Sequence, residues 1–349
     1  MIIAIYIIFI FIGVLSLINL NNKTVQNIWF VIIVIVLVLF AGTRSPYVDM
    51  DYGVYKFMWQ VKSLDEQAEI SFIFIKHMLK DVAKLKFPSL VFFYAVLGVG
   101  VKMIGIKRLS PFLFSSIIIY FSHYFLLHEM TQIRAGVASG FILIALYYLI
   151  KKEYAYYYAF AICAVCFHYS ASLCLLFPLL RNSKKSLVVY AFLIPIGYVL
   201  YFFSTYLDIN IPIPFIGDKI KLYKEATESG FLEDSKINVF NVVFVLKVVI
   251  WYICYAFSSK MSGYTDSVYL LLKIYALSLF SFLFLSNIPV FAFRVQELLG
   301  VVDIIIIPWV IYLFNERYKV IGEIVVIMIA LVFLVLNIYL NELLIIEKL

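Results

Sequence analysis

Charged side chains are scarce in this chain. Only 14% of its 349 residues are Asp, Glu, Lys or Arg, against about 25% in an ordinary soluble domain. Hydrophobic residues make up 65%, and the mean hydropathy is +1.02. A water-bounded fold of this size cannot hide so much apolar surface, which excludes a soluble protein. The apolar runs at 28–40, 247–257 and 321–340 do not alternate with polar residues, which excludes the strands of a membrane β-barrel.

Cysteine is also rare. All four cysteines lie inside apolar segments, which argues against a disulfide-bonded ectodomain: Cys163, Cys166, Cys174 and Cys254. Two of them stand close to His168, but no second pair of ligands follows, and thiols in helices are mostly small packing groups. The sequence therefore predicts neither a metal site nor another cofactor.

Other signals are missing as well. The first 20 residues have no basic n-region and no small-residue cleavage pattern, so we expect a retained helix instead of a cleaved signal. The chain has no internal repeat and no low-complexity segment. The net charge of +7 does not indicate nucleic acid as a partner, because cytoplasmic loops of membrane proteins accumulate Lys and Arg.

What the chain has instead is one long apolar stretch after another, and about 20 apolar residues suffice to span a membrane as a helix. We predict an all-α polytopic integral membrane protein, a single transmembrane domain over 1–349 with about 10–12 transmembrane helices. Residues 154–181 are interrupted near Phe167–Ser170 and form either one tilted helix or a short helix hairpin. The other predicted spans are 2–19, 28–43, 88–106, 111–128, 132–150, 186–206, 238–258, 265–286, 290–314 and 318–340.

Basic residues set the expected topology. The connections at 129–133 and 287–293 contain neither Lys nor Arg. Six other connections are basic: Lys23, Lys107/Arg108, Lys151/Lys152, Arg181/Lys184/Lys185, Lys260 and Arg317/Lys319. All six connections are cytoplasmic if residues 154–181 enter the membrane and return to the same side. A single crossing there would instead place 181–185 outside and reverse the sidedness of every later connection. We therefore predict the hairpin, with both termini and the Phe167–Ser170 break at the outer face of the membrane.

Two long extracytoplasmic loops follow from this topology, 44–87 and 207–236. The second contains several Pro and Gly residues together with Tyr223, and we interpret it as a lid or a substrate-contacting loop. The first contains an amphipathic stretch at 70–87, which is typical of an interfacial helix. Its apolar stripe is Phe74, Met78, Val82 and Leu85, and its basic stripe is Lys76, Lys80 and Lys84.

Two arginines open predicted helices at the outer face. Arg134 begins a helix among small residues, where a guanidinium and free backbone N–H groups suit a phosphate. The alternative is an Arg that reaches lipid headgroups. Arg294 lies near the start of a later helix, one turn before Glu297, and the alternative there is a structural Arg–Glu pair. Together the arginines suit a pyrophosphate, which carries more charge than one of them would neutralise.

Other polar residues could take part in catalysis. His168, at the hairpin break, suits a general base or a phosphate donor, and its alternative is a hydrogen-bonded packing residue. Asp49 and Asp51 lie among aromatic residues, and such a site suits a sugar, whose hydroxyls need acceptors and whose ring packs on a flat face. A solvated turn explains these two residues nearly as well. The remaining candidates are Asp49, Asp51 and Tyr52 in the first loop, and His128, Glu129 and Gln132 just before Arg134.

Four weak motifs in a fixed order resemble the EpsG-like family of Wzy-type polysaccharide polymerases. The first is Arg44 followed by the acidic, Tyr-containing segment 49–55, although a G-x-D-type pattern is replaced by Val48-Asp49-Met50-Asp51. The second is the helix start from Ile133 and Arg134 to Ala138, and the third is the F-H-x-S break at 167–170. The fourth is Arg294 opening a late helix that ends in an apolar run with Pro308. The resemblance covers about residues 40–310.

The resemblance implies a glycosyltransferase that polymerises repeat units of an O-antigen, capsule or exopolysaccharide at the extracytoplasmic face. Its partners would be undecaprenyl-pyrophosphate-linked oligosaccharide, membrane lipid and a chain-length regulator protein, without a metal. Such chemistry requires stabilisation of the departing pyrophosphate and removal of a proton from the acceptor hydroxyl. Arg134 and Arg294 suit the first task, and His168, Asp49 or Asp51 the second.

Two other functions stay open. One is a transporter or flippase of lipid-linked oligosaccharide, in which the arginines only bind; transporters often have internal repeats, which this chain lacks. The other is a membrane O-acyltransferase that acts on polysaccharide and uses His168 as its base. Long extracytoplasmic loops and paired arginines suit that enzyme less well.

Overall fold

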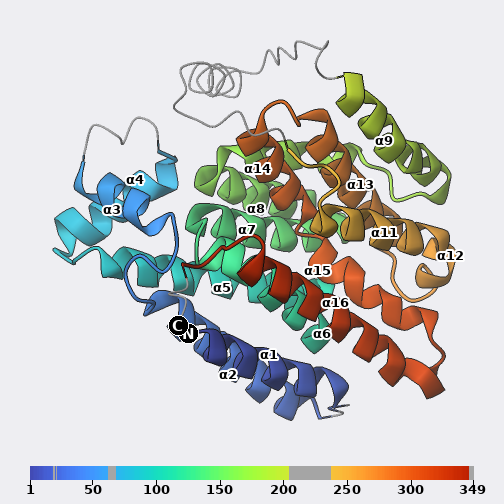
Figure 1. The fold of residues 1–349 in the computed structure, drawn as a ribbon, viewed down its shortest axis with the longest axis horizontal. Coiled ribbons are helices and arrows are strands. Elements are labelled where there is room, and N and C mark those ends of the chain that lie inside the picture. Colours follow the sequence, from blue (N-terminus) through green and yellow to red (C-terminus); the bar gives the residue numbers. More distant parts are fainter. Residues whose placement is uncertain (19, 21, 62–67, 204–236, 346–349) are drawn as a thin grey trace. The chain divides into compact units, whose positions relative to one another are not determined.

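The computed structural model describes the chain except residues 19, 21, 62–67, 204–236 and 346–349, and every regular element in the described part is helical (Figure 1). This confirms the predicted all-α polytopic membrane fold. Long, apolar helices able to cross a membrane are α2 (Lys23–Gly42), α5 (Pro88–Leu109), α7 (Ile133–Ile150), α9 (Lys184–Phe203) and the segment Glu316–Tyr339, which contains α16 (Lys319–Tyr339). Shorter apolar helices include α1 (Ile2–Leu17), α8 (Tyr154–Phe167), η4 (Tyr169–Leu179), α11 (Val242–Ala256) and α13 (Val268–Phe284).

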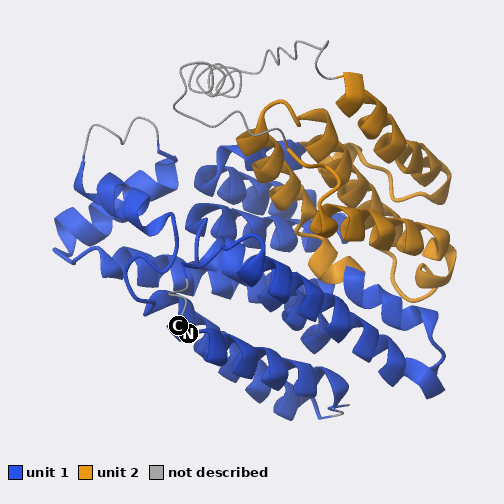
Figure 2. Cartoon of the chain, viewed as in Figure 1, with its two compact units in different colours: residues 1–175, 307–349 blue, residues 176–306 orange. Residues whose placement is uncertain are grey.

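The chain divides into two compact units (Figure 2). Unit 1 contains residues 1–175 and 307–349, and unit 2 contains residues 176–306. The expectation of a single transmembrane domain stays a prediction. The second predicted loop, with Tyr223, lies outside the described residues.

Close helix packing builds unit 1. Helix α5 packs against α2 and α7, and α7 packs against α8. Gly136 and Gly140 form a G-x-x-x-G pattern on α7, which lets helix backbones approach closely. A Cβ on Gly140 would lie 2.8 Å from the backbone nitrogen of Lys102 on α5. Glycine is therefore required where α7 meets α5.

Two predicted spans are less regular than expected. The span at 111–128 consists of α6 (Leu113–Ile119) and the wider π-helix η3 (Tyr120–Glu129). The span at 290–314 is broken into α14 (Pro289–Gly300), α15 (Asp303–Ile306) and the 3-10 helix η6 (Ile307–Leu313). Gly300 weakens the first helix, and Pro308 lacks the N–H that a continuous α-helix needs. The prediction of one uninterrupted helix there was wrong.

The region 154–181 folds as two short helices. Helix α8 ends at Phe167, and His168 adopts extended backbone angles (φ −154°, ψ 116°) before η4 begins. The hydroxyl of Tyr157 on α8 donates to the carbonyl of Cys174 on η4. Because this contact joins residues on either side of the break, the chain turns back there, as the hairpin interpretation expects.

The first long loop is largely helical, with α3 (Tyr52–Gln60), α4 (Ile70–Lys76) and η2 (His77–Val82). Its apolar stripe, Phe74, Met78, Val82 and Leu85, is exposed, as expected for an amphipathic segment, and Ile70 is exposed as well. The expected basic stripe has a different role. The Lys76 amine donates to the carbonyl of Met58 (2.7 Å), and the Lys80 amine donates to the carbonyl of Trp59 (2.7 Å). These two lysines therefore cap the C-terminus of α3, where helix carbonyls lack partners.

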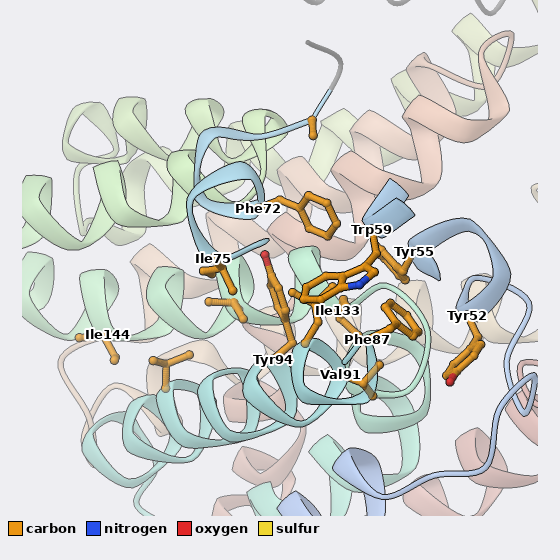
Figure 3. Close-up of a cluster of buried hydrophobic side chains, with 14 residues drawn as sticks. Tyr52, Tyr55, Trp59, Phe72, Ile75, Phe87, Val91, Tyr94, Ile133 and Ile144 are labelled. Atoms are coloured by element: carbon orange, nitrogen blue, oxygen red, sulfur yellow. The ribbon is translucent and has the colours of Figure 1, made fainter. Parts of the chain in front are cut away.

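Aromatic side chains attach this loop to the helices beneath it (Figure 3). The ring of Tyr52 packs edge-to-face against Phe87, with 5.1 Å between ring centroids. Phe72 lies 6.3 Å from both Tyr55 and Tyr94, centroid to centroid. The cluster places α3 and α4 next to the N-terminal end of α5. It brings Ala68 and Glu69, the two residues before α4, close to α7 and α8.

Candidate functional site

One buried carboxylate joins three segments of unit 1. Glu69 immediately precedes α4, and its Oε2 forms an ion pair with Nη1 of Arg134 in the first turn of α7. Its Oε1 lies 3.1 Å from Nδ1 of His168, at the break between α8 and η4. The side chains of Glu69, Arg134 and His168 are 3%, 19% and 10% exposed. The arginine and the histidine that the sequence singled out as separate candidates therefore meet at the same anion.

The surroundings hold the three groups in place. The guanidinium of Arg134 lies over the rings of Tyr55 (5.5 Å) and Phe72 (5.6 Å), in cation–π geometry. The Glu69 carbonyl accepts hydrogen bonds from the backbone N–H groups of Phe72 and Ile73. The hydroxyl of Tyr169, next to His168, donates to the carbonyl of Ala68 at 3.4 Å. The hairpin break therefore contacts both residues that lead into α4.

Electrostatics keep Glu69 ionised. Burial raises the pKa of this carboxyl, but the hydrogen bond from His168 and the positive charge of Arg134 outweigh burial and lower the pKa to about 2. The resulting stabilisation of the fold is present above the ordinary value of 4.5 and is lost as the pH falls toward 2. An ionised carboxylate only accepts hydrogen bonds, so Nδ1 of His168 is the donor and its other nitrogen, Nε2, is the basic one. Burial raises the pKa of Tyr55, which therefore remains a phenol.

A second polar network joins residues of α5, η3 and α7. The Lys102 amine is 2.9 Å from Oε1 of Glu129 and 3.0 Å from Nδ1 of His128. The Tyr120 hydroxyl donates to the same Glu129 oxygen at 2.8 Å, and Oγ of Ser139 is 3.2 Å from the His128 nitrogen. The side chains of Lys102 and Glu129 are fully buried. Such an ion pair is costly unless additional hydrogen bonds accompany it. Tyr120 and His128 supply such contacts, whereas Oε2 of Glu129 has no hydrogen-bond partner among the described residues.

The network favours a structural role for His128 and Glu129. A Cβ on Gly136 would lie 2.6 Å from Oε2 of Glu129, so the glycine makes room for the carboxylate. Gln132 is the N-cap residue of α7, two positions before Arg134. These residues support the helix start that carries Arg134.

The comparisons with known proteins agree with the expected family. The family model described as "EpsG family" matches residues 27–346. The chain belongs to the EpsG family. A curated relative, the amylovoran biosynthesis protein AmsC of Erwinia amylovora, is 24% identical over 297 residues, covering 80% of this chain and 77% of that protein. No solved structure matches the chain significantly.

The first motif of this EpsG-family chain forms a buried ion pair. Nε of Arg44 donates to Oδ2 of Asp49 at 2.9 Å, and Nη1 donates to the carbonyls of Ala41 (2.9 Å) and Glu129 (3.4 Å). This geometry favours a structural role for Arg44 and Asp49, which tie the loop to the end of η3. Asp51, the residue before α3, is half-buried and its role as a base stays a prediction.

Tyr52, expected near a sugar, has its ring in the aromatic core and is 6% exposed. This burial favours packing over contact with a substrate. The described residues contain no group of three or more His, Cys, Asp or Glu side chains arranged to hold a metal ion.

The fourth motif begins with Arg294 in unit 2, where α13 packs against α9 and α14, and its Pro308 belongs to unit 1. Arg294 is half-buried near the start of α14, and Glu297 is buried one turn later. In the same unit Nζ of Lys247 lies 3.5 Å from Oδ2 of Asp303, with both side chains almost fully buried. Because Arg294 and Arg134 belong to different units, their joint action on one pyrophosphate stays a prediction.

Sequence reasoning missed Glu69 and the buried lysines. Glu69 stands between a loop and an amphipathic stretch, where a carboxylate looks like an ordinary helix-start residue. Lys102 and Lys247 gave a clearer signal, because each is a single charge in the middle of a predicted span. Their positions alone could have indicated buried carboxylate partners.

Proposed function

We propose that this chain is a polysaccharide repeat-unit polymerase. It would transfer a growing glycan from undecaprenyl pyrophosphate to a lipid-linked repeat unit at the extracytoplasmic face of a bacterial inner membrane. The observation that carries the proposal is the convergence of Arg134 and His168 on Glu69 in a member of the EpsG family. The name of the Erwinia relative, an amylovoran biosynthesis protein, supports a role in glycan synthesis.

The transfer step needs an acid–base group and an anion site. The acceptor hydroxyl attacks the anomeric carbon of the growing glycan, and its proton passes to Nε2 of His168. The bond between that carbon and the pyrophosphate oxygen breaks, and the electron pair leaves with the lipid pyrophosphate. Arg134 stabilises the charge that develops on this leaving group. The positive charge that His168 gains is stabilised by the carboxylate of Glu69, as in hydrolase triads.

Burial raises the pKa of the Asp49 carboxyl despite the nearby guanidinium of Arg44, but protonation of Asp49 would weaken its ion pair with Arg44, and this favours His168 as the base. A carboxylate that already accepts from a buried guanidinium loses that partner's stabilisation when it takes up a proton. His168 keeps its hydrogen bond to Glu69 in both protonation states. Arg294 is assigned to the same pyrophosphate as a second cation, and a chain-length regulator protein is assigned as a partner, both from the resemblance.

The length of lipid-linked glycan in a deletion strain tests the proposed function. A polymerase loss leaves single repeat units outside the membrane. Single units retained inside would indicate a flippase, and full-length polymer without acyl groups would indicate an O-acyltransferase. Either of the latter outcomes overturns the proposal.

Complementation with Arg134→Lys tests the anion site. We expect loss of most polymer although the charge is retained, because an ammonium cannot reproduce the planar, bidentate fork of a guanidinium. Arg294→Lys is expected to behave in the same way. Arg317→Lys, at an exposed position, is the matched control and should restore full-length polymer. Normal polymer from the variants at 134 and 294, at equal protein level, would reduce both arginines to headgroup anchors.

A further inference from the structure

Both groups assigned to the reaction are already bound to an internal anion. The two oxygens of Glu69 contact Arg134 and His168, one each. The three side chains are largely buried. Nη1 of Arg134, a donor that a lipid pyrophosphate would need, is therefore already bonded to a carboxylate of the chain before any substrate arrives.

A carboxylate and a pyrophosphate cannot share these donors without repulsion. Like charges at contact distance repel strongly where water is excluded. One of the two anions has to leave the guanidinium when the other binds.

The backbone indicates how the exchange takes place. The Glu69 carbonyl accepts from Phe72 N–H (2.9 Å) and Ile73 N–H (3.2 Å), and Tyr169 holds the preceding carbonyl. Farther along the same element, the Lys76 amine is bonded to the end of α3. These contacts hold α4 in position, so the exchange needs only rotation of the Glu69 side chain.

We propose that Glu69 is a substrate placeholder: its carboxylate occupies the pyrophosphate position on Arg134 in the empty enzyme, is displaced when the lipid pyrophosphate binds, and returns to expel the spent carrier. A tethered carboxylate competes at high effective concentration. Weakly charged anions such as a monophosphate are therefore kept off Arg134, whereas a pyrophosphate has enough charge to compete. Glu69 thus selects pyrophosphate over monophosphate. This role rests on the proposed function of the site.

Binding of inorganic pyrophosphate and inorganic phosphate to the full-length protein in lipid nanodiscs tests the placeholder role. Glu69→Gln keeps the shape of the side chain and removes its charge. We expect it to bind pyrophosphate about tenfold or more tightly than the unchanged protein, and to lose discrimination against phosphate. Its KM for lipid-linked repeat units should fall because the substrate binds more tightly, and its kcat should fall because product release slows and because His168 loses the carboxylate that stabilises its positive charge. Glu153→Gln, an exposed carboxylate before α8, is the matched control and should change none of these values.

Further variants keep the outcomes distinct. Glu69→Asp retains the charge but is one methylene shorter and cannot bridge both donors, so it should also tighten pyrophosphate binding. Glu69→Asp replaces Glu69→Gln in the binding experiment if the Gln variant does not accumulate as folded protein. Unchanged or weaker pyrophosphate binding in both variants would overturn the placeholder role, even if Arg134→Lys abolishes polymerisation. Normal polymerisation by Arg134→Lys would instead overturn the proposed function of the site, whatever the Glu69 variants do.

Discussion

At the scale of single residues, His168 offers the sharpest test of the chemistry. General-base assistance typically contributes about 10²–10⁴-fold, so His168→Ala should lower the polymerisation rate by that factor while lipid-linked substrate still binds. His168→Gln can still donate to Glu69 but cannot take a proton, and it should be equally slow. Rates of glycan extension by purified protein would measure both variants.

The chain provides a matched control for that experiment. Nδ1 of His77 lies 2.9 Å from Oδ2 of Asp81, the same pairing as at His168, but the imidazole is 61% exposed. His77→Gln should extend glycan at the normal rate. Recovery of activity in His168→Gln would make the residue a positioning group and Asp51 the better base. Normal rates in both the Ala and the Gln variant would make it a packing residue.

Sequence reasoning at this scale identified the cations but not the anion between them. Arg134 and His168 stood out because each begins or interrupts an apolar helix. Glu69 is separated from them by 65 and 99 positions. One sequence contains no signal that links such distant residues, and the carboxylate precedes a helix, where acidic residues are common. Only the folded hairpin reveals the shared contact.

At the scale of helices, the contact between α5 and α7 depends on a glycine, which has no side chain to separate the two backbones. Gly140→Ala would place a Cβ 2.8 Å from the Lys102 backbone nitrogen and 2.4 Å from a methyl carbon of Val101. Overpacking of this kind costs about 1–3 kcal/mol, and we expect a lower melting temperature for purified Gly140→Ala. Gly100→Ala is the control on α5, because its Cβ would meet no atom within 4 Å. It should leave stability unchanged or raise it slightly. Equal melting temperatures for the two variants would contradict this account of the contact.

Helix existence was easier to predict than helix continuity. Every predicted span has helical structure, because long apolar stretches leave a membrane protein little other choice. The breaks after Gly300 and around Pro308 were missed because hydropathy continues through them. The break at His168 was found because a polar group interrupts the apolar run there. A helix break can therefore be predicted from the sequence only where polar residues interrupt the apolar run.

At the scale of the whole molecule, sidedness is the feature to test. Single cysteines can be placed at positions 152, 170 and 184 after the four native cysteines are replaced by alanine. Because all six basic connections share one side in the hairpin topology, position 170 should react with a membrane-impermeant thiol reagent added outside. Positions 152 and 184 should react only from the cytoplasmic side. Labelling of 152 and 184 from opposite sides would rule out the hairpin topology.

Sequence reasoning reached the fold class and family of the molecule but not the relation between its units. Composition and spacing predict spanning helices and their sidedness, which are properties of each segment by itself. The pairing of Arg134 with Arg294 concerns one residue of unit 1 and one of unit 2, and no property of a single segment encodes it. That pairing is therefore the prediction for which the variants at 134 and 294 matter most.

Purification will change what the exposed stripe of α4 and η2 touches. A detergent micelle surrounds it with a curved, rapidly exchanging surface, whereas a bilayer presents a flat leaflet with its own lateral pressure. Ile70, which is exposed like the stripe, directly follows Glu69. The surface that surrounds the stripe therefore lies one residue from the carboxylate that holds Arg134 and His168. The reconstitution lipid is thus a variable to control when chain elongation is measured with purified protein.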